Sequence, residues 1–422
     1  MSTQPHTRVI VVCPTEYGGQ IEHAADTAMA LAADSTVEQV ILLSRPGAAA
    51  YLGQPRVDGL RIVETIPPRR TGEWGPLRRM VQVLDLIREH AQIRALSASA
   101  GPNLVLALDS SKYPWPRLLT AEKSQRLALF LHNVKPHHDE TAASLRERVL
   151  RHLELGAARG ADRVIVHGAD QKRTARQTVP GDLVAVTLPT STRIDEVATA
   201  ASVPVEVNDD AVATTAGSSS QPQADLNSLT AQPYALVLGE LRANKGVELA
   251  IDAAGSAGVP LLVAGRPESA ELGRELHHRA DRAGTVTILD RFLERTEFAQ
   301  LLDSASVVVL PYTRFDAQSG ILAKAVAGGL PIVASDLASL KEQAGAHQPA
   351  IFADVHNTRE FGQAMRRGFD AAVTDQRHRP LGDRGVSTGD PEAAPSSNGA
   401  DHSDWDSTVA AVLGTRRAGR RR

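Results

Sequence analysis

Short apolar runs alternate with helical patterns along this chain, stop, and then start again. The apolar runs lie at 8–13, 40–43, 104–108, 128–131 and 163–166 in the first series, and at 235–238, 261–264, 286–289, 307–310, 332–334 and 351–352 in the second. The helical patterns lie near 20–33, 76–96, 140–158 and 169–177, and then near 246–257, 268–283, 296–304, 319–329 and 358–372. Continuous apolar runs of this length are typical of strands that a parallel sheet buries on both faces. The sequence therefore predicts an α/β protein of two doubly wound, Rossmann-like domains facing a cleft.

Two segments differ from this pattern in composition. Residues 196–232 are rich in Ala, Ser, Thr and Gln, and residues 374–404 are rich in Pro, Gly, Ser and Asp. Neither segment has enough apolar surface to offset the entropy of ordering, so both are expected to be flexible. We therefore expect an N-terminal domain over 1–195, a linker over 196–232 and a C-terminal domain over 233–373. The remainder, 374–422, is expected to hold a low-complexity stretch, a closing helix near 403–413 and a basic tail.

Composition excludes several classes of protein. The 46 basic and 49 acidic residues give a formal net charge of −3, which argues against a nucleic-acid binder. The single cysteine, Cys13, excludes an intrachain disulfide framework, and no metal site is expected. No apolar run approaches the length of a membrane span, and the first residues lack a signal pattern. A soluble cytoplasmic protein is therefore expected.

The loop after the first apolar run contains two adjacent glycines, Gly18 and Gly19. Neither a dinucleotide-binding nor a P-loop motif occurs there. Paired glycines allow the backbone to approach a ligand at the start of a helix. The same pair is equally typical of a plain strand-to-helix turn.

An ordered set of short motifs in both halves carries a family resemblance. In the second half the motifs are L-G-E-L-R-A-N-K-G at 238–246, D-R-F at 290–292, P-Y and Q-S-G between 311 and 320, and A-V-A-G-G-L-P-I-V-A-S-D at 325–336. In the first half they are H-N-V-K-P-H at 132–137 and A-D-R-V-I-V-H at 161–167. Together they resemble the retaining glycosyltransferases of family 4, which have the GT-B fold. The resemblance covers about 10–195 and 233–372.

The resemblance implies a hexose-type transfer from a nucleotide-sugar donor to a hydroxyl acceptor, with retention and without a cofactor. Such a transfer develops negative charge on the leaving diphosphate, which cations and helix-start amides can stabilise. The implied donor-binding residues are Gly18, Gly19, Arg242, Lys245, Gly246, Asp316, Gln318, Ser319 and Gly320, and the implied catalytic residues are His132 and Asp109.

Each of these side chains also has an ordinary structural interpretation. Arg242 and Lys245 are also typical of a solvated pair at a helix start. His132 could simply satisfy backbone groups at a strand end, and Asp109 could be a helix N-cap.

Departures from the family pattern leave alternatives open. Asp316 and Lys324 align with the two acids of its Glu-x7-Glu motif, Glu240 stands where many members carry Arg, and Thr190 replaces a histidine. Lys324 cannot accept a hydrogen bond from a ribose hydroxyl. A nucleotide-sugar epimerase or hydrolase of the same fold, or a non-catalytic GT-B scaffold or regulatory protein, therefore stands beside the transferase.

A cluster of arginines near residue 422 suggests a partner for the tail. The cluster consists of Arg416, Arg417, Arg420, Arg421 and Arg422. It predicts peripheral contact with anionic lipid at the inner face of a membrane, which would suit a lipid-linked acceptor. A solubilising tail is the alternative.

Overall fold

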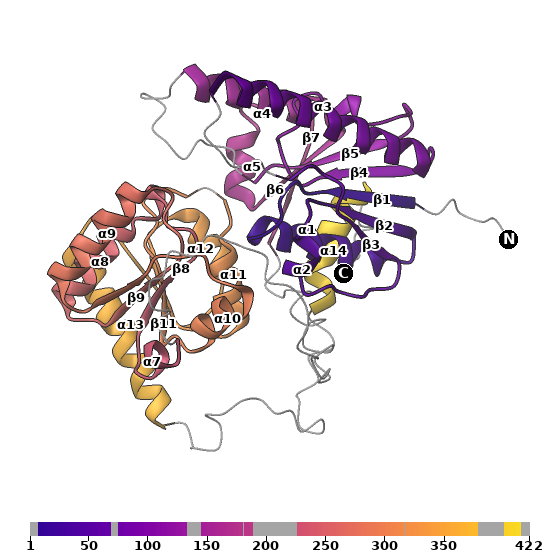
Figure 1. Cartoon of the computed structure of the whole chain (residues 1–422). Coiled ribbons are helices and arrows are strands. Elements are labelled where there is room, and N and C mark those ends of the chain that lie inside the picture. Colours follow the sequence, from indigo (N-terminus) through magenta and orange to yellow (C-terminus); the bar gives the residue numbers. More distant parts are fainter. Residues whose placement is uncertain are drawn as a thin grey trace, which may run out of the picture. The chain divides into compact units, whose positions relative to one another are not determined.

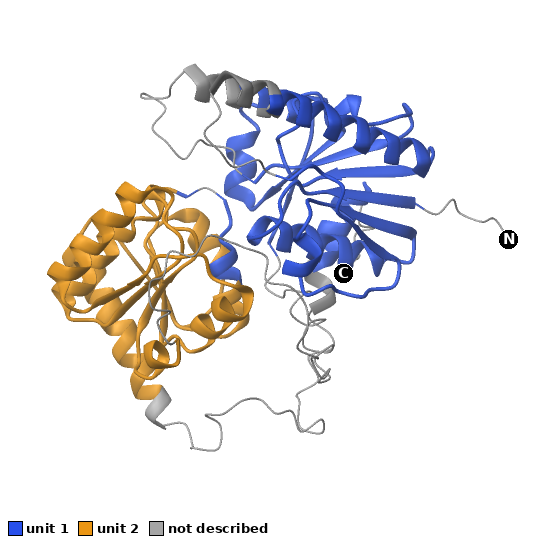
Figure 2. Ribbon diagram, viewed as in Figure 1, with its two compact units in different colours: residues 1–197, 315–323, 390–422 blue, residues 198–314, 324–389 orange. Residues whose placement is uncertain are grey.

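The computed structural model describes residues 7–68, 75–132, 145–179, 181–188, 226–315, 317–378 and 401–414. The chain divides into two compact units (Figure 2). Unit 1 comprises residues 1–197, 315–323 and 390–422, and unit 2 comprises residues 198–314 and 324–389. Each unit contains a sheet of parallel strands with helices packed on it (Figure 1).

The sheet of unit 1 has seven strands in the described residues, in the order β3-β2-β1-β4-β5-β6-β7. The strands are β1 (Thr7–Val12), β2 (Val37–Leu43), β3 (Leu60–Val63), β4 (Leu104–Leu108), β5 (Arg126–Phe130), β6 (Arg163–His167) and β7 (Asp182–Val186). Every pairing is parallel. Successive residues of β1 point to opposite faces, so Val9 and Val11 lie in one apolar core and Ile10 and Val12 in the other. Both faces of this sheet are therefore buried.

Helices cover both of these faces. They are α1 (Gly19–Ala32), α2 (Ala48–Tyr51), α3 (Gly75–Ala100), the 3-10 turn η1 (Pro116–Leu118), α4 (Leu145–Gly160), α5 (Ala169–Ala175) and α14 (Asp401–Leu413). The last helix, α14, is distant in sequence but packs beside α1, and its residues Trp405, Val409 and Val412 belong to the same core as α1.

Unit 2 repeats the architecture with a sheet of six strands in the described residues, in the order β10-β9-β8-β11-β12-β13. The strands are β8 (Ala235–Leu238), β9 (Leu261–Ala264), β10 (Val286–Leu289), β11 (Val307–Leu310), β12 (Ile332–Ser335) and β13 (Ala350–Ala353). The helices are α7 (Leu226–Thr230), η2 (Ala243–Lys245), α8 (Val247–Ala257), α9 (Ala270–Ala283), α10 (Arg295–Asp303), α11 (Gly320–Ala327), α12 (Ala338–Ala344) and α13 (Thr358–His378). Its core packs α8 and α13 against the central strands.

The structure confirms the two doubly wound units and each predicted strand, and it adds two strands that the sequence did not indicate. The added strands, β3 and β7, are the two edges of the first sheet. Most of their residues are only half-buried, and an arginine interrupts the apolar run of β3. Edge strands need less apolar sequence because one side faces solvent, so the sequence signal is weak.

The expected boundaries need correction at two points. The short helix α7 falls inside the expected linker 196–232, and α13 continues to His378, past the expected domain end at 373. The closing helix predicted near 403–413 is present as α14, which begins two residues before Ser403. Among the described helices, none combines the length and the apolar composition that crossing a bilayer requires.

Candidate functional site

Three neighbouring strands of unit 1 end in polar residues. Asp109 directly follows β4, His132 lies two residues after β5, and His167 is the last residue of β6. Because neighbouring parallel strands lie about 4.8 Å apart and end at the same edge, these side chains meet. His23, from the first turns of α1, completes the group. We call His23, Asp109, His132 and His167 the histidine cluster.

Asp109 holds two of the histidines. Its Oδ1 lies 2.5 Å from Nε2 of His132 and 3.1 Å from Nδ1 of His23. Burial alone would raise the pKa of Asp109, but His132 and His23 lower it overall. Burial also opposes the charged form of His132, and Asp109 nevertheless raises the pKa of that ring above its ordinary value. Asp109 is therefore a carboxylate at neutral pH, and the structure brings together the two residues predicted as catalytic.

His167 is the uncharged member of the cluster. Burial lowers its pKa well below the ordinary value, and the charges of His23 and His132 lower it further. Neither of its ring nitrogens has a hydrogen-bond partner in the described parts of the chain. The ring of His167 stacks on that of His132, with centres 5.4 Å apart, and meets the ring of His23 edge-on at 5.0 Å.

Two glutamines fix the backbone around the cluster. Gln171, fully buried on α5, accepts from the backbone N–H of His167 at 2.7 Å and donates to the carbonyl of His132 at the same distance. Gln20, on α1, donates to the carbonyl of Asp109. The ends of β4, β5 and β6 are therefore linked by side chains to the helices that follow β1 and β6.

The loop that holds the predicted Gly18 and Gly19 begins α1. Gly18 has a φ of 89°, in the region that favours glycine, and it caps the helix. A Cβ on either glycine would meet no atom within 4 Å, so space for an approaching ligand remains beside both. The structure therefore fits both interpretations of this pair.

A buried ionic network holds the start of the same loop. Arg45 donates from Nε to the carbonyl of Pro14 at 2.7 Å, and its Nη2 lies 3.0 Å from Oε1 of Glu89. Lys112 reaches both carboxylate oxygens of Glu89, at 2.7 and 2.8 Å. This charge is buried but fully paired, which is the condition under which a buried carboxylate is tolerated.

In unit 2, the predicted Arg242, Lys245 and Gly246 lie in the turn between β8 and α8. Gly246 has a φ of 62°, and a Cβ there would lie 2.1 Å from the carbonyl oxygen of Pro311. Only glycine fits this close approach, which is secured by a 3.0 Å hydrogen bond from the N–H of Thr313 to the carbonyl of Asn244. The turn therefore lies directly against the end of β11.

Lys245 and Arg242 have different surroundings. Lys245 is half-buried, and burial together with the charge of Arg242 lowers its pKa to about 8. Within the described residues, no carboxylate lies within ion-pair distance of its ammonium group. Arg242 is more exposed and pairs with Glu240 at 2.5 Å, which matches the solvated interpretation.

The remaining predicted donor residues precede α11. The Oγ of Ser319 accepts from the N–H of Leu322 at 3.3 Å and caps the helix that Gly320 begins. Gln318 accepts a hydrogen bond from the backbone of Leu188, and both residues belong to unit 1. Asp316 lies outside the described residues, as do the arginines of the tail. The predicted donor residues are divided between the units, because Arg242, Lys245 and Gly246 belong to unit 2 and the other described ones to unit 1.

The sequence analysis missed His23, His167 and Gln171. A signal for His167 was present, since a polar residue ends each of three successive apolar runs. The order of the strands is needed to show that these three ends are neighbours. His23 and Gln171 lie within helices, where a sequence pattern alone does not separate a buried polar side chain from an exposed one.

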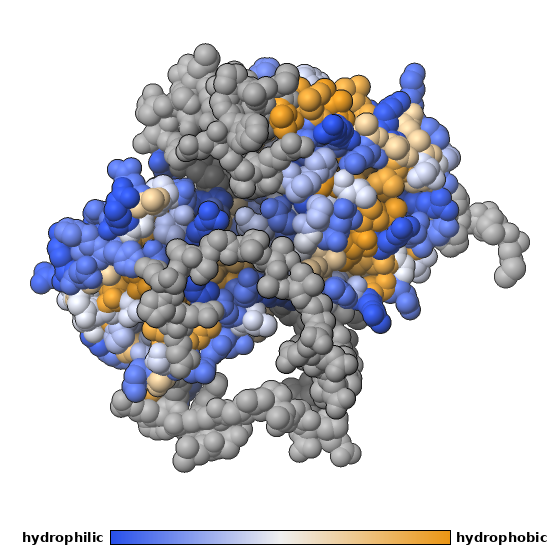
Figure 3. All heavy atoms as spheres, in the orientation of Figure 1, coloured by the Kyte–Doolittle hydropathy of each residue, from blue (hydrophilic) through white to orange (hydrophobic). Residues whose placement is uncertain are grey.

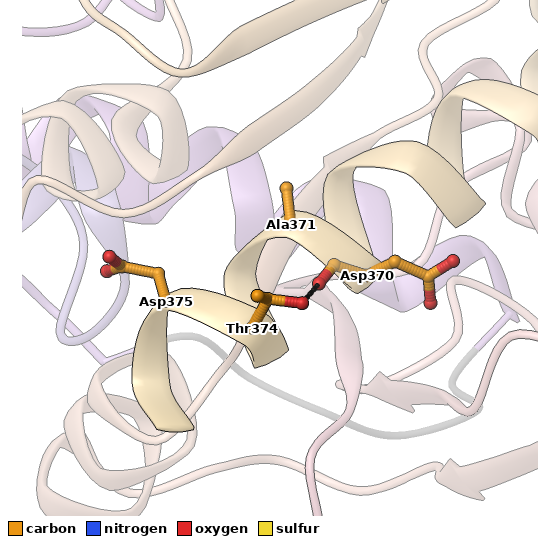
Figure 4. A pocket seen from close by; sticks show the side chains of 4 residues that line it. All are labelled: Asp370, Ala371, Thr374 and Asp375. Carbon is orange, nitrogen blue, oxygen red and sulfur yellow. Dashed lines mark hydrogen bonds between the residues drawn. The ribbon is translucent and has the colours of Figure 1, made fainter. Parts of the chain in front are cut away.

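A hollow on the described surface is lined by residues other than these. It has a volume of about 490 Å³ and is lined by one helix face, that of Asp370, Ala371, Thr374 and Asp375 on α13 (Figure 4). It gathers two carboxylates but no cation or nucleophile. On the visible face of the molecule, hydrophilic and hydrophobic residues are interspersed (Figure 3).

Comparison with known proteins gives the class. Residues 232–370 match the family model "Glycosyl transferases group 1", which spans the turn of Lys245 and the start of α11. Among the curated proteins, no sequence matches this chain.

Three solved structures illustrate the likeness of fold. Sucrose-phosphate synthase from Thermosynechococcus elongatus has 16% identity and a TM-score of 0.60, covering 88% of this chain and 98% of its own. Anabaena HepE in complex with UDP-glucose has 14% identity and a TM-score of 0.58, with 88% and 91% covered. An α,α-trehalose-phosphate synthase (UDP-forming) from Burkholderia xenovorans, in complex with glucose-6-phosphate, has 14% identity and a TM-score of 0.56, with 97% and 96% covered.

These findings define a protein of the GT-B fold. The match to the group 1 glycosyltransferase model covers residues 232–370, most of which belong to unit 2. The domain and the fold together support a glycosyltransferase enzyme.

Proposed function

We propose that this protein transfers a hexose-type sugar from a nucleoside diphosphate sugar to a hydroxyl acceptor, with retention, as a member of glycosyltransferase family 4. The observation that carries the proposal is the half-buried Lys245, which lies in the matched domain without a carboxylate partner in the described residues. A cation that has lost part of its hydration and is unpaired is a good site for the charge of a diphosphate. HepE, with a similar fold, binds UDP-glucose.

In this proposal each unit has a distinct task. Lys245 and Arg242 offset the charge that develops on the leaving diphosphate, so no metal or cofactor is needed there. The N–H groups at the start of α11 add donors with the favourable end of the helix dipole. In unit 1, His132 hydrogen-bonds a hydroxyl of the sugar or acceptor, while Asp109 fixes the orientation of its ring.

Calorimetric titration with UDP-, GDP- and ADP-glucose tests the proposal. We expect one of the three to bind, and Lys245→Met to weaken that binding by roughly 10- to 100-fold, because a charge-assisted contact is lost. Binding of the free nucleoside should not change. Lys341→Met is the matched control, because Lys341 already pairs with Asp336. If none of the sugars binds, or if nucleoside and nucleotide sugar weaken equally, the diphosphate role is wrong.

The lysine on α11 supports a second candidate, a GT-B scaffold without turnover. Lys324 occupies the position of an acid in the resembling family and cannot accept from ribose hydroxyls. This candidate predicts weak nucleotide binding, no released nucleotide in the presence of acceptors, and tighter binding in Lys324→Glu. Release of a free, altered sugar without any acceptor would instead indicate the epimerase or hydrolase.

We further propose that the acceptor is lipid-linked and that the protein acts at the cytoplasmic face of a membrane. The support is the five-arginine cluster at 416–422 in a chain of net charge −3. Each basic residue near an anionic surface contributes about 1 kcal/mol. In sedimentation with vesicles of anionic lipid, the full chain should bind, and a chain shortened at residue 415 should not. Equal binding to neutral vesicles would contradict this proposal.

A further inference from the structure

The histidine cluster contains several buried polar atoms that lack a partner. Within the described residues these atoms are Nε2 of His23, Oδ2 of Asp109 and both ring nitrogens of His167. A buried polar group without a hydrogen bond costs about 1–3 kcal/mol, so most such groups in proteins are paired. Several unpartnered polar atoms in one cluster therefore indicate a binding site for a ligand.

The spacing of the three rings indicates which kind of ligand. One ring nitrogen from each of His23, His132 and His167 lies within 4.8 Å of the others. The ring centres are 5.0, 5.1 and 5.4 Å apart. Imidazoles bound to a tetrahedral ion through Zn–N bonds of about 2.1 Å have ring centres about 5 Å apart. The ring centres are therefore already at the separation that one ion requires.

Asp109 supplies the second shell that metal-binding histidines need. A ligating histidine usually donates its other ring N–H to a carboxylate, which fixes the ring and strengthens the ligand. Oδ1 of Asp109 lies at hydrogen-bond distance from Nδ1 of His23 and Nε2 of His132. This leaves Nε2 of His23 and Nδ1 of His132 for the metal. Gln171 holds the backbones of His132 and His167 on either side.

We propose that His23, His132 and His167 bind a late first-row divalent cation, for which Zn²⁺ is the best match, at the carboxyl edge of the first sheet. Three neutral imidazoles suit Zn²⁺ and its neighbours and do not suit Mg²⁺ or Ca²⁺. Three protein ligands leave a fourth position for water or another oxygen ligand. With the ion bound, the hydroxyl that the proposed function assigns to His132 would contact the ion at this position instead of the ring. The side chain of His132 is 28% exposed and provides the path of entry. No metal site was predicted from the sequence, because the three histidines are spread over 144 residues from first to last.

Metal binding by the tag-free full chain tests the site. After dialysis against a chelator, calorimetry should show one Zn²⁺ per chain, and Co²⁺ should give the visible absorption of a tetrahedral site, which Zn²⁺ then removes. His167→Gln and His23→Gln should weaken binding by at least 100-fold, and Asp109→Asn by roughly 10- to 100-fold. The control is His278→Gln, an exposed histidine on α9, which should bind as the natural chain does.

Several outcomes would overturn the site. These are the absence of stoichiometric Zn²⁺ binding by the natural chain, full binding in His167→Gln, or equal loss in His278→Gln. The measurement on the natural chain does not depend on any variant folding, and circular dichroism checks the fold of each variant. Because no nucleotide sugar is used, the result is independent of the proposed transfer reaction.

Discussion

Lys245 carries its charge in a half-buried position, and this has a measurable consequence. Burial and the neighbouring Arg242 lower its pKa to about 8, whereas a lysine in the unfolded chain titrates near 10.5. Between these two pH values, Lys245 is therefore mostly protonated in the unfolded chain and mostly deprotonated in the folded one. Within that window, the contribution of Lys245 to stability rises with pH. Binding of a diphosphate instead becomes weaker as the pH rises, since it needs the protonated form of Lys245.

Donor affinity should consequently depend on pH through this one residue. Below about pH 8 the ammonium form is already present, and affinity should be constant. Above it, each pH unit should weaken binding by up to tenfold, because the proton must be restored before the diphosphate is bound. Lys245→Arg should bind with a flat profile, since an arginine stays charged throughout. Calorimetric titrations between pH 7 and 10 measure the donor affinity of the natural chain and of Lys245→Arg. The same loss of affinity with pH in the arginine variant would rule out Lys245 as the cause.

Asp109 and His132 show what residue-level reasoning predicted about the candidate site. Each follows an apolar run and was implied by the family resemblance, and the structure shows a contact between them that was not predicted. Their joint electrostatics also depends on His23 and His167, neither of which was among the predicted residues. The sequence identified strand-end positions correctly, but it gave no means to find the partners that reach them from other elements.

At the scale of elements, α14 matters more than its distance from the rest of its unit suggests. It comes after a segment of unusual composition, yet its Trp405 is 3% exposed and lies in the core that contains α1 and β1. Burial of a side chain of this size is among the larger single contributions to a core. The helix is therefore an integral part of unit 1.

Replacing Trp405 by alanine should reveal this role. The change leaves a cavity under α14 and should lower the free energy of unfolding of unit 1 by about 3–5 kcal/mol. Trp115→Ala is the matched control, because Trp115 is 61% exposed and its loss should cost about 0.5 kcal/mol or less. Urea denaturation measures both. Similar losses in the two variants would mean that α14 does not stabilise the unit.

At the scale of the whole molecule, the two units have separate cores, each with its own sheet. All three tryptophans, Trp74, Trp115 and Trp405, belong to unit 1. Tryptophan fluorescence therefore reports the unfolding of unit 1, whereas circular dichroism reports both units. Because all the tryptophans belong to unit 1, the two spectroscopic signals can show which unit the nucleotide sugar and Zn²⁺ stabilise.

A saturating nucleotide sugar should shift the unfolding transition of unit 2 further than that of unit 1. At 100 times its Kd the donor should stabilise the protein by about 2.7 kcal/mol, and the circular dichroism curve should report most of this shift. The fluorescence transition should shift less, because unit 1 contributes only the start of α11 and His132 to the proposed donor contacts. Zn²⁺ should stabilise unit 1 and shift the fluorescence transition, since its proposed ligands all lie in that unit. A donor that shifts the fluorescence transition as far as the dichroism curve would contradict the assignment of the diphosphate site to unit 2.

The sequence by itself determined the architecture of this protein, because apolar periodicity and the strand–helix alternation are local properties that a chain shows without its fold. The same local logic placed Asp109 and His132 after strands, and the family motif placed Lys245 and Gly246 at the start of a helix. The tertiary structure alone decided which of these ends are neighbours. In a parallel sheet the spatial order of the strands differs from their order in the chain, so β1 lies beside β4. That order, together with α1, places His23 against His132 and His167 and forms a cluster that no local pattern contains.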